Sequence, residues 1–327
     1  MINILELRPN PHSKSDGIDK YCNALRLLFQ NDDNVNILPI ENYPMKNTGV
    51  LKEFYVGSRL KEEIQRKDID IIHINGFASF SVLQCFWLAL KAKKKIVYTA
   101  HWHPFNYLNH PFRAKVFFYF FLRPLVKLGS NAIIAINSED YSFFSRIREN
   151  VKRIPHWVEI TQLQPKIEKD PFMILFVGRL NDTNKGIEHL LHLPKGEYHI
   201  HCVGPGEIEL REDFIRHVDV SSEELQKLYS KASLLVVPSR YEAFSYVALE
   251  ALSAGTPVLL SNRVRIADYL EGVQGVDVFK YQDYSEFCDR VKRSIGAKVD
   301  VEVINSIFSI DKIKEQYKSL FLEIANN

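Results

Sequence analysis

Two glutamates, Glu242 and Glu250, lie eight positions apart within the stretch Leu234–Leu260. On a helix of 3.6 residues per turn, eight positions correspond to about 80° of rotation, so both carboxylates can face one ligand. The alternative is that both are ordinary helix residues in contact with water, which is the usual state of glutamate.

Two cations occur earlier in the same half of the chain. Arg179 follows Gly178 at the predicted end of a strand, and Lys185 with Gly186 is predicted to open a helix. A guanidinium, an ammonium and helix-terminal N–H groups would together stabilise the negative charge of a diphosphate. The alternative is a solvated loop between a strand and a helix.

The stretch around the glutamates predicts a strand, a loop, a helix and a second strand. The apolar run Leu234–Val237 indicates a buried strand, and apolar residues at helical spacing indicate a helix over Phe244–Ala254. Gly255 suits a left-handed helix cap, and Pro257 begins the next strand. A loop between the carboxyl end of a parallel strand and a helix is where α/β proteins bind anions and nucleotides.

Strand and helix patterns alternate along the whole chain, which predicts an α/β protein with two Rossmann-like doubly wound domains facing across a cleft. Besides the strands named above, the predicted strands are Ile2–Leu7, Val35–Ile40, Ile69–Ile74, Ile96–Ala100, Ala132–Ile136, Val151–Ile154, Phe172–Val177, Tyr198–Val203 and Gly275–Phe279. The other predicted helices are Gly17 to about Gln30, Leu51–Lys67, Ser79–Lys91, Phe112–Lys127, one from Ser138, one from Lys185, Ser222–Ser230, Tyr284–Ser294 and Asp311–Ile324.

A polar segment bracketed by prolines, Pro155–Pro171, is the predicted interdomain linker. We therefore expect a first domain over 1–160, a second over 161–310, and a C-terminal helix over 311–327 that packs back on the first domain. Its apolar stripe, which includes Ile313, Tyr317 and Phe321, is that of an amphipathic helix.

The composition excludes several classes of protein. A net charge of +2 over 327 residues argues against a nucleic-acid binder. The four cysteines are far apart, which suits packing in a reducing cytosol better than disulfides or zinc. The N-terminal apolar run is short for a signal peptide, and no segment approaches the ~20 apolar residues of a membrane span. We expect a cytoplasmic protein that attaches at most to the membrane surface.

The residues together resemble a known family. Glu242-x7-Glu250, placed between Pro238-Ser239 and Gly255-x-Pro257 and combined with Gly178-Arg179-Leu180 and Lys185-Gly186, resembles the family 4 retaining glycosyltransferases, which have the GT-B fold. The resemblance runs from Ile2 to about Gly275, through Gly17, Asp70-Ile-Ile-His73, Thr99-Ala-His101 and Ser138.

The resemblance implies a role for each matching residue. Arg179 and Lys185 would bind the donor diphosphate, Glu242 the hydroxyls of the donor sugar, and Glu250 the ribose. His101 would lie beside the donor sugar, so His101 and Glu242 are the expected catalytic residues. The remaining donor contacts would be Gly17 near the phosphates, the N–H groups of Phe244, Ser245 and Tyr246 at the helix start, and the backbone near Val218 at the base.

The chain departs from the family pattern at three places. The first loop has the single glycine Gly17 after Asp16, and His156-Trp157 replaces a common Asn-Gly. Ala243 and Ser245 stand where glycines are usual, which keeps the N–H donors but restricts φ. We expect any unusual placement of the donor sugar to arise there.

No cofactor or metal is expected, since Arg179, Lys185 and the helix dipole can stabilise the departing diphosphate, as a divalent ion does in other glycosyltransferases. Asp68-Ile-Asp70 precedes its strand and is predicted to be structural. His101 with His103, and His199 with His201, have the spacing of metal ligands but no suitable third ligand, so packing or substrate contact is expected. His73 is expected in the core or on the cleft floor.

The segment 111–127 contains six consecutive bulky apolar residues, Phe117–Leu122, between basic residues. An interior helix is the favoured interpretation, because a helix that is apolar all round is usually buried. The alternative is a helix that partly contacts a membrane interface with anionic lipid.

The predicted function is transfer of a sugar, with retention, from a nucleotide-diphosphate sugar to a saccharide or lipid-linked saccharide acceptor, in bacterial surface polysaccharide synthesis. The first domain would bind the acceptor and the second the donor. One alternative is a GT-B sugar-nucleotide 2-epimerase, and another is a non-catalytic nucleotide-sugar-binding partner subunit. A dehydrogenase is disfavoured, because Gly204-Pro-Gly206 lacks the third glycine and Pro205 lacks an N–H.

Overall fold

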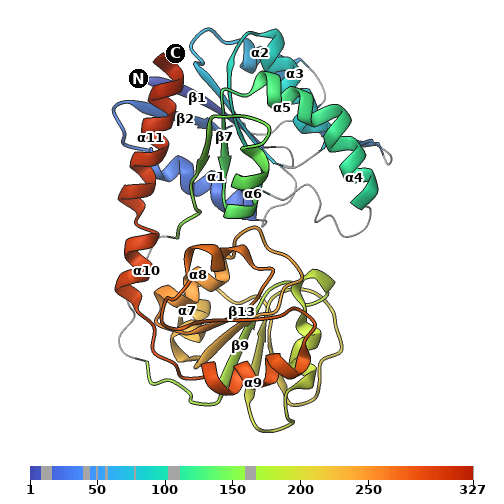
Figure 1. Cartoon of the computed structure of the whole chain (residues 1–327), viewed down its shortest axis with the longest axis vertical. Helices are drawn as coiled ribbons and strands as arrows, with labels where there is room; N and C mark the ends of the chain where they lie inside the picture. Colours follow the sequence, from blue (N-terminus) through green and yellow to red (C-terminus); the bar gives the residue numbers. More distant parts are fainter. Residues whose placement is uncertain are drawn as a thin grey trace. The chain divides into compact units, whose positions relative to one another are not determined.

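A computed structural model describes residues 1–8, 17–39, 45–48, 51–55, 58–76, 79–101, 111–158 and 167–326. The chain forms two compact units (Figure 1). Unit 1 comprises Met1–His156 together with Ile310–Asn327, and unit 2 comprises Trp157–Ser309. Residues 159–166 of the expected linker Pro155–Pro171 lie outside the described residues.

Unit 1 contains a six-stranded sheet in the order β2-β1-β5-β6-β7-β8, in which every neighbouring pair is parallel. The strands are β1 (Ile2–Leu7), β2 (Val35–Pro39), β5 (Ile71–Asn75), β6 (Lys95–Thr99), β7 (Ala132–Ala135) and β8 (Val151–Arg153). All six lie where the apolar runs predicted them. Their burial explains the runs, since a parallel sheet covered on both faces has apolar residues at successive positions.

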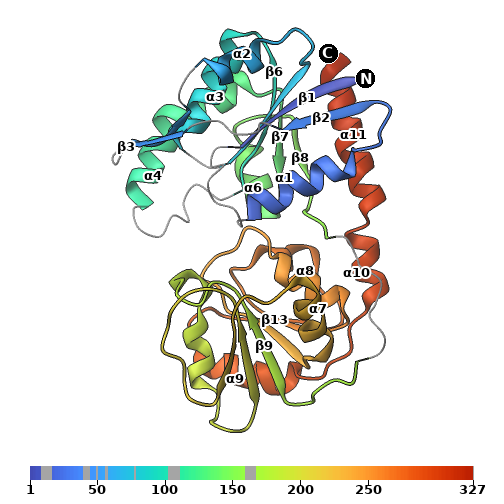
Figure 2. The same cartoon turned by 180° about the vertical axis from the view of Figure 1, so that it is seen from behind.

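Helices cover both faces of this sheet (Figures 1 and 2). They are α1 (Gly17–Leu28), α2 (Arg59–Gln65), α3 (Phe80–Lys91), α4 (Pro111–Phe117), the π-helix η1 (Phe118–Leu122), α5 (Arg123–Gly129), α6 (Ser138–Phe144) and α11 (Ile310–Asn326). On one face the core includes Ile72, Ile74, Phe86 and Phe118. Near the other face α1 and α11 meet, where the hydroxyl groups of Tyr21 and Tyr317 lie 3.0 Å apart.

The helix predicted over Leu51–Lys67 is wrong in its first half. The strands β3 (Met45–Thr48) and β4 (Leu51–Tyr55) pair in an antiparallel hairpin, and only Arg59–Gln65 is helical. The aromatic residues Phe54 and Tyr55 favour a strand, and pairing with β3 satisfies backbone groups that a helix would otherwise satisfy internally.

The segment 111–127 is not the interior helix that we favoured. Phe118, Leu122 and Val126 are buried, but Phe112, Tyr119, Phe120 and Phe121 are 45–77% exposed. The π-helical turn lies within the run of aromatic residues. One side of the segment therefore packs on the sheet and the other faces outward, and none of the described helices is long and apolar enough to span a bilayer.

Unit 2 contains a second six-stranded parallel sheet, in the order β11-β10-β9-β12-β13-β14. Its strands are β9 (Met173–Val177), β10 (His199–Val203), β11 (Phe214–His217), β12 (Leu234–Val237), β13 (Val258–Ser261) and β14 (Val276–Phe279). Its helices are α7 (Ser222–Lys231), α8 (Tyr246–Ser253), α9 (Tyr284–Ser294), α10 (Val301–Ile307) and the 3-10 segments η2 (Thr183–Lys185), η3 (Ile187–His192) and η4 (Arg265–Tyr269).

Each face of the second sheet has its own apolar core. One core joins the sheet to α7, α8 and α10, and the other joins it to η3 and α9. Both sheets are therefore doubly wound, as predicted. Four local features differ from the prediction: strand β11, helix α10 and the 3-10 segment η4 were not expected, and the helix expected from Lys185 is instead a pair of short 3-10 segments.

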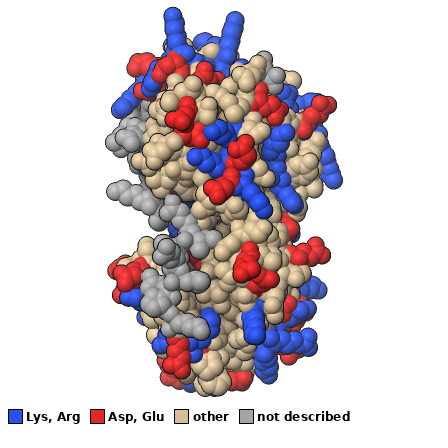
Figure 3. Space-filling view, turned by 90° about the vertical axis from the view of Figure 1, so that its left-hand side faces the viewer, with Lys and Arg blue, Asp and Glu red and all other residues tan. Residues whose placement is uncertain are grey.

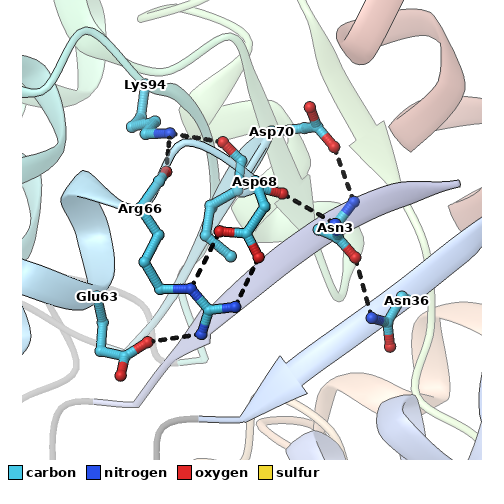
Figure 4. A network of polar contacts seen from close by, with 8 residues as sticks. Asn3, Asn36, Glu63, Arg66, Asp68, Asp70 and Lys94 are labelled. Carbon is cyan, nitrogen blue, oxygen red and sulfur yellow. Dashed lines mark hydrogen bonds and ion pairs between the residues drawn. The ribbon is translucent and has the colours of Figure 1, made fainter.

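Asp68 and Asp70 lie at the amino end of β5 and belong to a polar network (Figure 4). The Asp70 carboxylate accepts a hydrogen bond from the backbone N–H of Asn3 at 2.8 Å, and the Arg66 guanidinium donates two hydrogen bonds to Asp68, at 3.1 and 2.6 Å. The Asp70 carboxylate and the main-chain carbonyl of Asp68 thus tie β1 to the turn before β5, and the Asp68 carboxylate holds Arg66, so the structural role predicted for them is confirmed.

The surface carries both signs of charge. Figure 3 shows Lys and Arg side chains interspersed with Asp and Glu over one face. Opposite charges also pair: Lys314 and Lys318 of α11 both contact the Asp32 carboxylate, at 3.3 and 3.1 Å. Positive and negative side chains are therefore interspersed on this face, in keeping with the net charge of +2.

Candidate functional site

Most of the predicted donor residues lie at one edge of the unit 2 sheet. Because its strands are parallel, the loops after β9, β11 and β12 all leave from the same edge. These loops carry Arg179, Val218 and Glu242 respectively. Residues separated by more than sixty positions in the sequence are thus gathered at one edge, which is where ligands bind in open α/β sheets.

The loop after β9 is held in shape by a capping carboxylate and a glycine. The Asp182 side chain accepts a hydrogen bond from the N–H of Asn184 at 3.0 Å, which starts the η2 turn. Gly186 then has φ of +71°, and a Cβ at this position would collide with the carbonyl oxygen of Pro238. Only glycine allows this approach, which brings Lys185 against the loop after β12.

The Glu242 loop is fixed on two sides by backbone and amide contacts. Asn184 Nδ2 donates to the carbonyl of Tyr241 at 2.9 Å. The Glu242 N–H donates to the carbonyl of Arg263 at 3.2 Å, and the Arg265 N–H donates to the carbonyl of Glu242 at 2.9 Å. The position of Glu242 is therefore set by two separate segments, η2 and the turn after β13.

Lys185 and Glu242 form an ion pair, with 2.7 Å between Nζ and Oε1. The Ser239 hydroxyl donates to the same carboxylate oxygen at 2.8 Å. Attraction by Glu242 raises the pKa of Lys185, so the ammonium stays charged at neutral pH. Arg179 acts on the same ammonium in the opposite direction, through like-charge repulsion. Two cations and a carboxylate thus share one small region.

Helix α8 begins beside this ion pair. Its N-cap residue, Ser245, is 2% exposed and its hydroxyl makes no cap hydrogen bond. Ser245 has φ of −151°, and Ala243 is not among the non-glycine residues with positive φ. The loop therefore needs no glycine at either position where the family usually has one. The main-chain N–H groups of Phe244, Ser245 and Tyr246 lie at the positive end of the helix dipole.

Glu250 lies on α8, and its side chain has a defined orientation. The hydroxyl group of Tyr229, from α7, donates to Glu250 Oε2 at 2.8 Å. Tyr229 is fully buried, and burial raises its pKa well above the ordinary value, so it remains a donor at any physiological pH. No sequence spacing pointed to Tyr229, which lies 21 positions from Glu250.

Val218 follows the unpredicted strand β11, and half of its surface is exposed. The next residue, Asp219, has φ of 54°, so the chain turns sharply there. The backbone of Val218 is therefore at the carboxyl edge of the sheet, as β11 requires.

The two remaining predicted site residues belong to unit 1. Gly17 is the first residue of α1 and is exposed, while Asp16 and the loop before it lie outside the described residues. His101 follows β6, is 9% exposed, and its Nε2 lies 3.0 Å from Asn75 Oδ1. Burial is the main cause that lowers the pKa of His101 well below the ordinary value, so the imidazole is neutral.

The paired histidines have other partners. His199 Nδ1 lies 2.8 Å from Asp170, and His201 Nδ1 lies 2.8 Å from His217 Nε2. His73 is fully buried and pairs with the hydroxyl of Thr99 at 2.9 Å. His103 lies outside the described residues. Within the described ranges, no group of three or more His, Cys, Asp or Glu side chains could hold a metal ion.

Models of two known families match the chain. The family described as Glycosyltransferase Family 4 matches residues 19–162, and the family described as Glycosyl transferases group 1 matches residues 171–296. The first match falls in unit 1 apart from its last six residues, and the second lies within unit 2.

Two curated relatives and one solved structure are informative. The chain is 28% identical over 233 residues to a 41.2 kDa protein in the cps region of Klebsiella pneumoniae, covering 63% of this chain and 64% of that protein. It is 26% identical over 177 residues to the lipopolysaccharide 1,2-N-acetylglucosaminetransferase of Salmonella typhimurium, covering 46% of this chain and 45% of that enzyme. The chain thus spans less than two thirds of either relative.

The structure of Alr3699/HepE from Anabaena, in complex with UDP-glucose, superposes with a TM-score of 0.74 at 16% identity, over 99% of this chain and all of that one. Together with the two parallel sheets, this similarity confirms the GT-B fold.

Proposed function

The chain belongs to the family 4 glycosyltransferases, and from that premise we propose that it moves a sugar from a nucleotide-diphosphate donor to a saccharide or lipid-linked saccharide acceptor, with retention at the anomeric carbon. The observation that carries this proposal is the edge of the unit 2 sheet, where Arg179, Lys185 and Glu242 gather at the start of α8.

The donor would bind at this edge of the sheet, with its diphosphate against the two cationic side chains. Arg179 and Lys185 would bind the diphosphate together with the N–H groups of Phe244, Ser245 and Tyr246 at the α8 terminus. Diphosphate binding would compete with Glu242 for Lys185, since the two now pair at 2.7 Å. The released Glu242, still held by Ser239, would then accept hydrogen bonds from hydroxyl groups of the donor sugar.

Four further contacts would complete donor recognition. Glu250, oriented by Tyr229, would bind the ribose hydroxyls, and the backbone near Val218 would contact the base. Gly17 and His101, from unit 1, would contact the phosphates and the donor sugar. Unit 1 would bind the acceptor.

In the reaction, the bond from the anomeric carbon to the diphosphate oxygen breaks and a bond to the acceptor hydroxyl oxygen forms. Negative charge grows on the diphosphate as it leaves, and its departing oxygen would take up the proton of the acceptor hydroxyl. Arg179, Lys185 and the α8 dipole can stabilise that charge, which is the contribution a divalent ion makes elsewhere. We therefore expect transfer without added metal.

The test begins with UDP-glucose, since the Anabaena structure was solved with that compound. Thermal-shift measurements with UDP-, GDP- and ADP-sugars identify the donor, because a bound ligand raises stability. Arg179→Ala and Glu242→Ala should abolish transfer while unfolding stays cooperative, whereas Arg293→Ala, at an exposed position on α9, should retain it. Full activity of either site variant, or loss of activity in excess EDTA, would contradict the proposal.

Two alternatives give different results in the same assays. A 2-epimerase would convert the nucleotide sugar without an acceptor, which NMR detects directly. A non-catalytic binding subunit would bind the donor by calorimetry but show neither transfer nor slow donor hydrolysis. The intact Lys185–Glu242–Ser239 arrangement favours transfer over both.

The relatives support a pathway for this reaction. One lies in a cps region and another is a lipopolysaccharide sugar transferase. We therefore place the acceptor in a bacterial surface polysaccharide, such as a capsule, an O-antigen or an exopolysaccharide, built on a saccharide or a lipid-linked saccharide at the cytoplasmic side of the membrane.

An exposed aromatic surface of unit 1 would hold the enzyme at the membrane. It comprises Trp87, Phe112, Tyr119, Phe120 and Phe121, which are 45–77% exposed. Basic groups lie against it, with Lys91 Nζ 5.1 Å from the Trp87 ring centroid and the Arg123 guanidinium 6.0 Å from that of Tyr119. Aromatic residues beside cations suit the interface of a bilayer that contains anionic lipid.

Vesicle sedimentation tests this contact. Phe120→Ser with Phe121→Ser should reduce binding to vesicles of phosphatidylcholine and phosphatidylglycerol at least several-fold, because two large apolar side chains are lost. Phe172→Ser, which removes a similarly exposed phenylalanine from unit 2, is the matched control. Equal binding by both variants would exclude this surface as the membrane contact.

A further inference from the structure

A row of buried polar side chains lies at the carboxyl ends of three neighbouring strands of unit 1. Glu6 of β1 is 3% exposed, Asn75 of β5 is fully buried, and His101 follows β6 with 9% exposure. Neighbouring side chains on the strands are in register, with Glu6 opposite His73 and Asn75 opposite Thr99. Burial of so many polar groups is unfavourable unless they are hydrogen-bonded, so their connections are informative.

The amide of Asn75 connects Glu6 to His101 through two hydrogen bonds, and each bond has a defined donor. Asn75 Nδ2 lies 3.3 Å from Glu6 Oε1, and Asn75 Oδ1 lies 3.0 Å from His101 Nε2. The amide nitrogen can only donate and the amide oxygen can only accept. The contact with Glu6 is a hydrogen bond that the Asn75 amide nitrogen donates to the carboxyl oxygen Oε1, so the nitrogen end of the amide faces Glu6. The oxygen end must then accept from a protonated Nε2 of His101.

This polarity determines the tautomer of His101. A neutral imidazole that carries its proton on Nε2 has an unprotonated Nδ1, which can only accept a hydrogen bond. His101 Nδ1 is buried and has no hydrogen-bond partner among the residues that the structure describes. The surrounding rings of Tyr21 and His156, with centroids 4.6 and 5.4 Å from that of His101, hold the imidazole in place.

We propose that Asn75 and Glu6 are positioning residues that hold His101 as its Nε2–H tautomer, so that Nδ1 accepts a hydrogen bond from a hydroxyl group of a sugar substrate. The identity of this ligand as a sugar rests on the proposed glycosyl transfer, whereas the tautomer of His101 does not. A histidine with the opposite tautomer would present an N–H to the sugar and could not accept from its hydroxyl group. Removal of the acceptor in Glu6 would let the Asn75 amide rotate and would allow both tautomers.

The tautomer can be measured without any substrate. Long-range ¹H–¹⁵N NMR of the ¹⁵N-histidine-labelled full chain distinguishes a protonated from an unprotonated ring nitrogen, and His101→Gln assigns the signals. We expect Nε2–H in the wild type and in Glu6→Gln, whose amide oxygen can still accept, and a mixture of tautomers in Glu6→Met. Thr99→Val, which removes the partner of His73 instead, should leave His101 unchanged. Nδ1–H in the wild type, or no change in Glu6→Met, would overturn the proposal.

The ligand is identified in a second arm. A change of the Nδ1 resonance with UDP-glucose but not with UDP assigns the hydroxyl to the donor sugar, and a change only after a saccharide acceptor is added assigns it to the acceptor. With an active wild type, kcat/KM of Glu6→Met should fall about tenfold, the equivalent of one hydrogen bond, while Glu6→Gln stays near wild type. An unchanged kcat/KM in Glu6→Met would overturn the positioning role. An inactive wild type with the expected tautomer would instead count against the proposed function.

Discussion

The ion pair between Lys185 and Glu242 should stabilise unit 2 in the absence of donor. We expect Lys185→Met and Glu242→Gln each to lower the free energy of unfolding of unit 2, and the double variant to lose less than the sum of the two. The reason is that either single change leaves one group of a partly buried pair without its partner, whereas the double change removes both.

The expected coupling follows from the geometry of the pair. The two charged atoms are 2.7 Å apart, and the side chains are 29% (Lys185) and 11% (Glu242) exposed. A hydrogen bond between charged groups contributes about 1.5–3 kcal/mol, and the partial exposure of the lysine lowers this to about 1–2 kcal/mol. Lys227 and Glu223 on α7 provide a matched control, because they are also 2.7 Å apart but are 52% and 69% exposed. Their coupling should be clearly smaller than that of Lys185 and Glu242, because solvent screens both charges.

Hydrogen exchange measured by mass spectrometry in increasing urea reports on unit 2 separately from unit 1, through peptides that cover β9 and β12. The four variants of each cycle give the coupling energy. A Lys185–Glu242 coupling no larger than that of the α7 pair would refute the argument that this pair is desolvated and stabilising. It would also remove the competition between donor and Glu242 from the proposed binding sequence.

Three further perturbations have defined outcomes. Burial raises the pKa of Glu6 from 4.5 to about 8, so at pH values between these two the folded state holds a proton that the unfolded state has lost. The free energy of unfolding of unit 1 should therefore fall as pH rises from about 5 to 8. Urea titrations of Glu6→Gln should show a weaker dependence on pH. Gly186→Ala should lower the free energy of unfolding by at least ~2 kcal/mol, because the alanine would combine a φ of +71° with a collision against the Pro238 carbonyl. Gly196→Ala has a similar φ of +76° but open space around the Cβ, so the same measurement should show a loss of only ~1 kcal/mol. Tyr229→Phe removes the hydrogen bond to Glu250. Calorimetry should show donor binding weakened about fivefold, equivalent to about 1 kcal/mol. An unchanged Kd would show that this hydrogen bond does not orient Glu250 for the ribose.

Secondary structure was predictable wherever the apolar pattern reflects burial in the sheets. The strands Ile2–Leu7 and Leu234–Val237 occur where the runs place them, since a strand covered on both faces must be apolar at every position. The prediction failed at β4, where pairing with β3 overrides a helical pattern. It also failed around Lys185, where the chain tightens into 3-10 turns so that Gly186 can pass the Pro238 carbonyl.

Exposure was the least predictable property. An apolar run such as Phe117–Leu122 indicates burial, yet only Phe118 and Leu122 of this run are fully buried. Which side of a helix is covered depends on the neighbouring elements, and these are not encoded in the local spacing.

The sequence by itself determined the α/β class, the two doubly wound sheets, the family, and the residue types that a donor site requires. Local patterns suffice for these, because strand burial, helix periodicity and turn glycines depend on residues close together in the chain. Only the tertiary structure decided which groups touch. Lys185 meets Glu242 across 57 positions, Tyr229 meets Glu250 across 21, and His101 meets Asn75 across 26. Such contacts depend on strand order and register, which bring distant loops to one edge of a sheet.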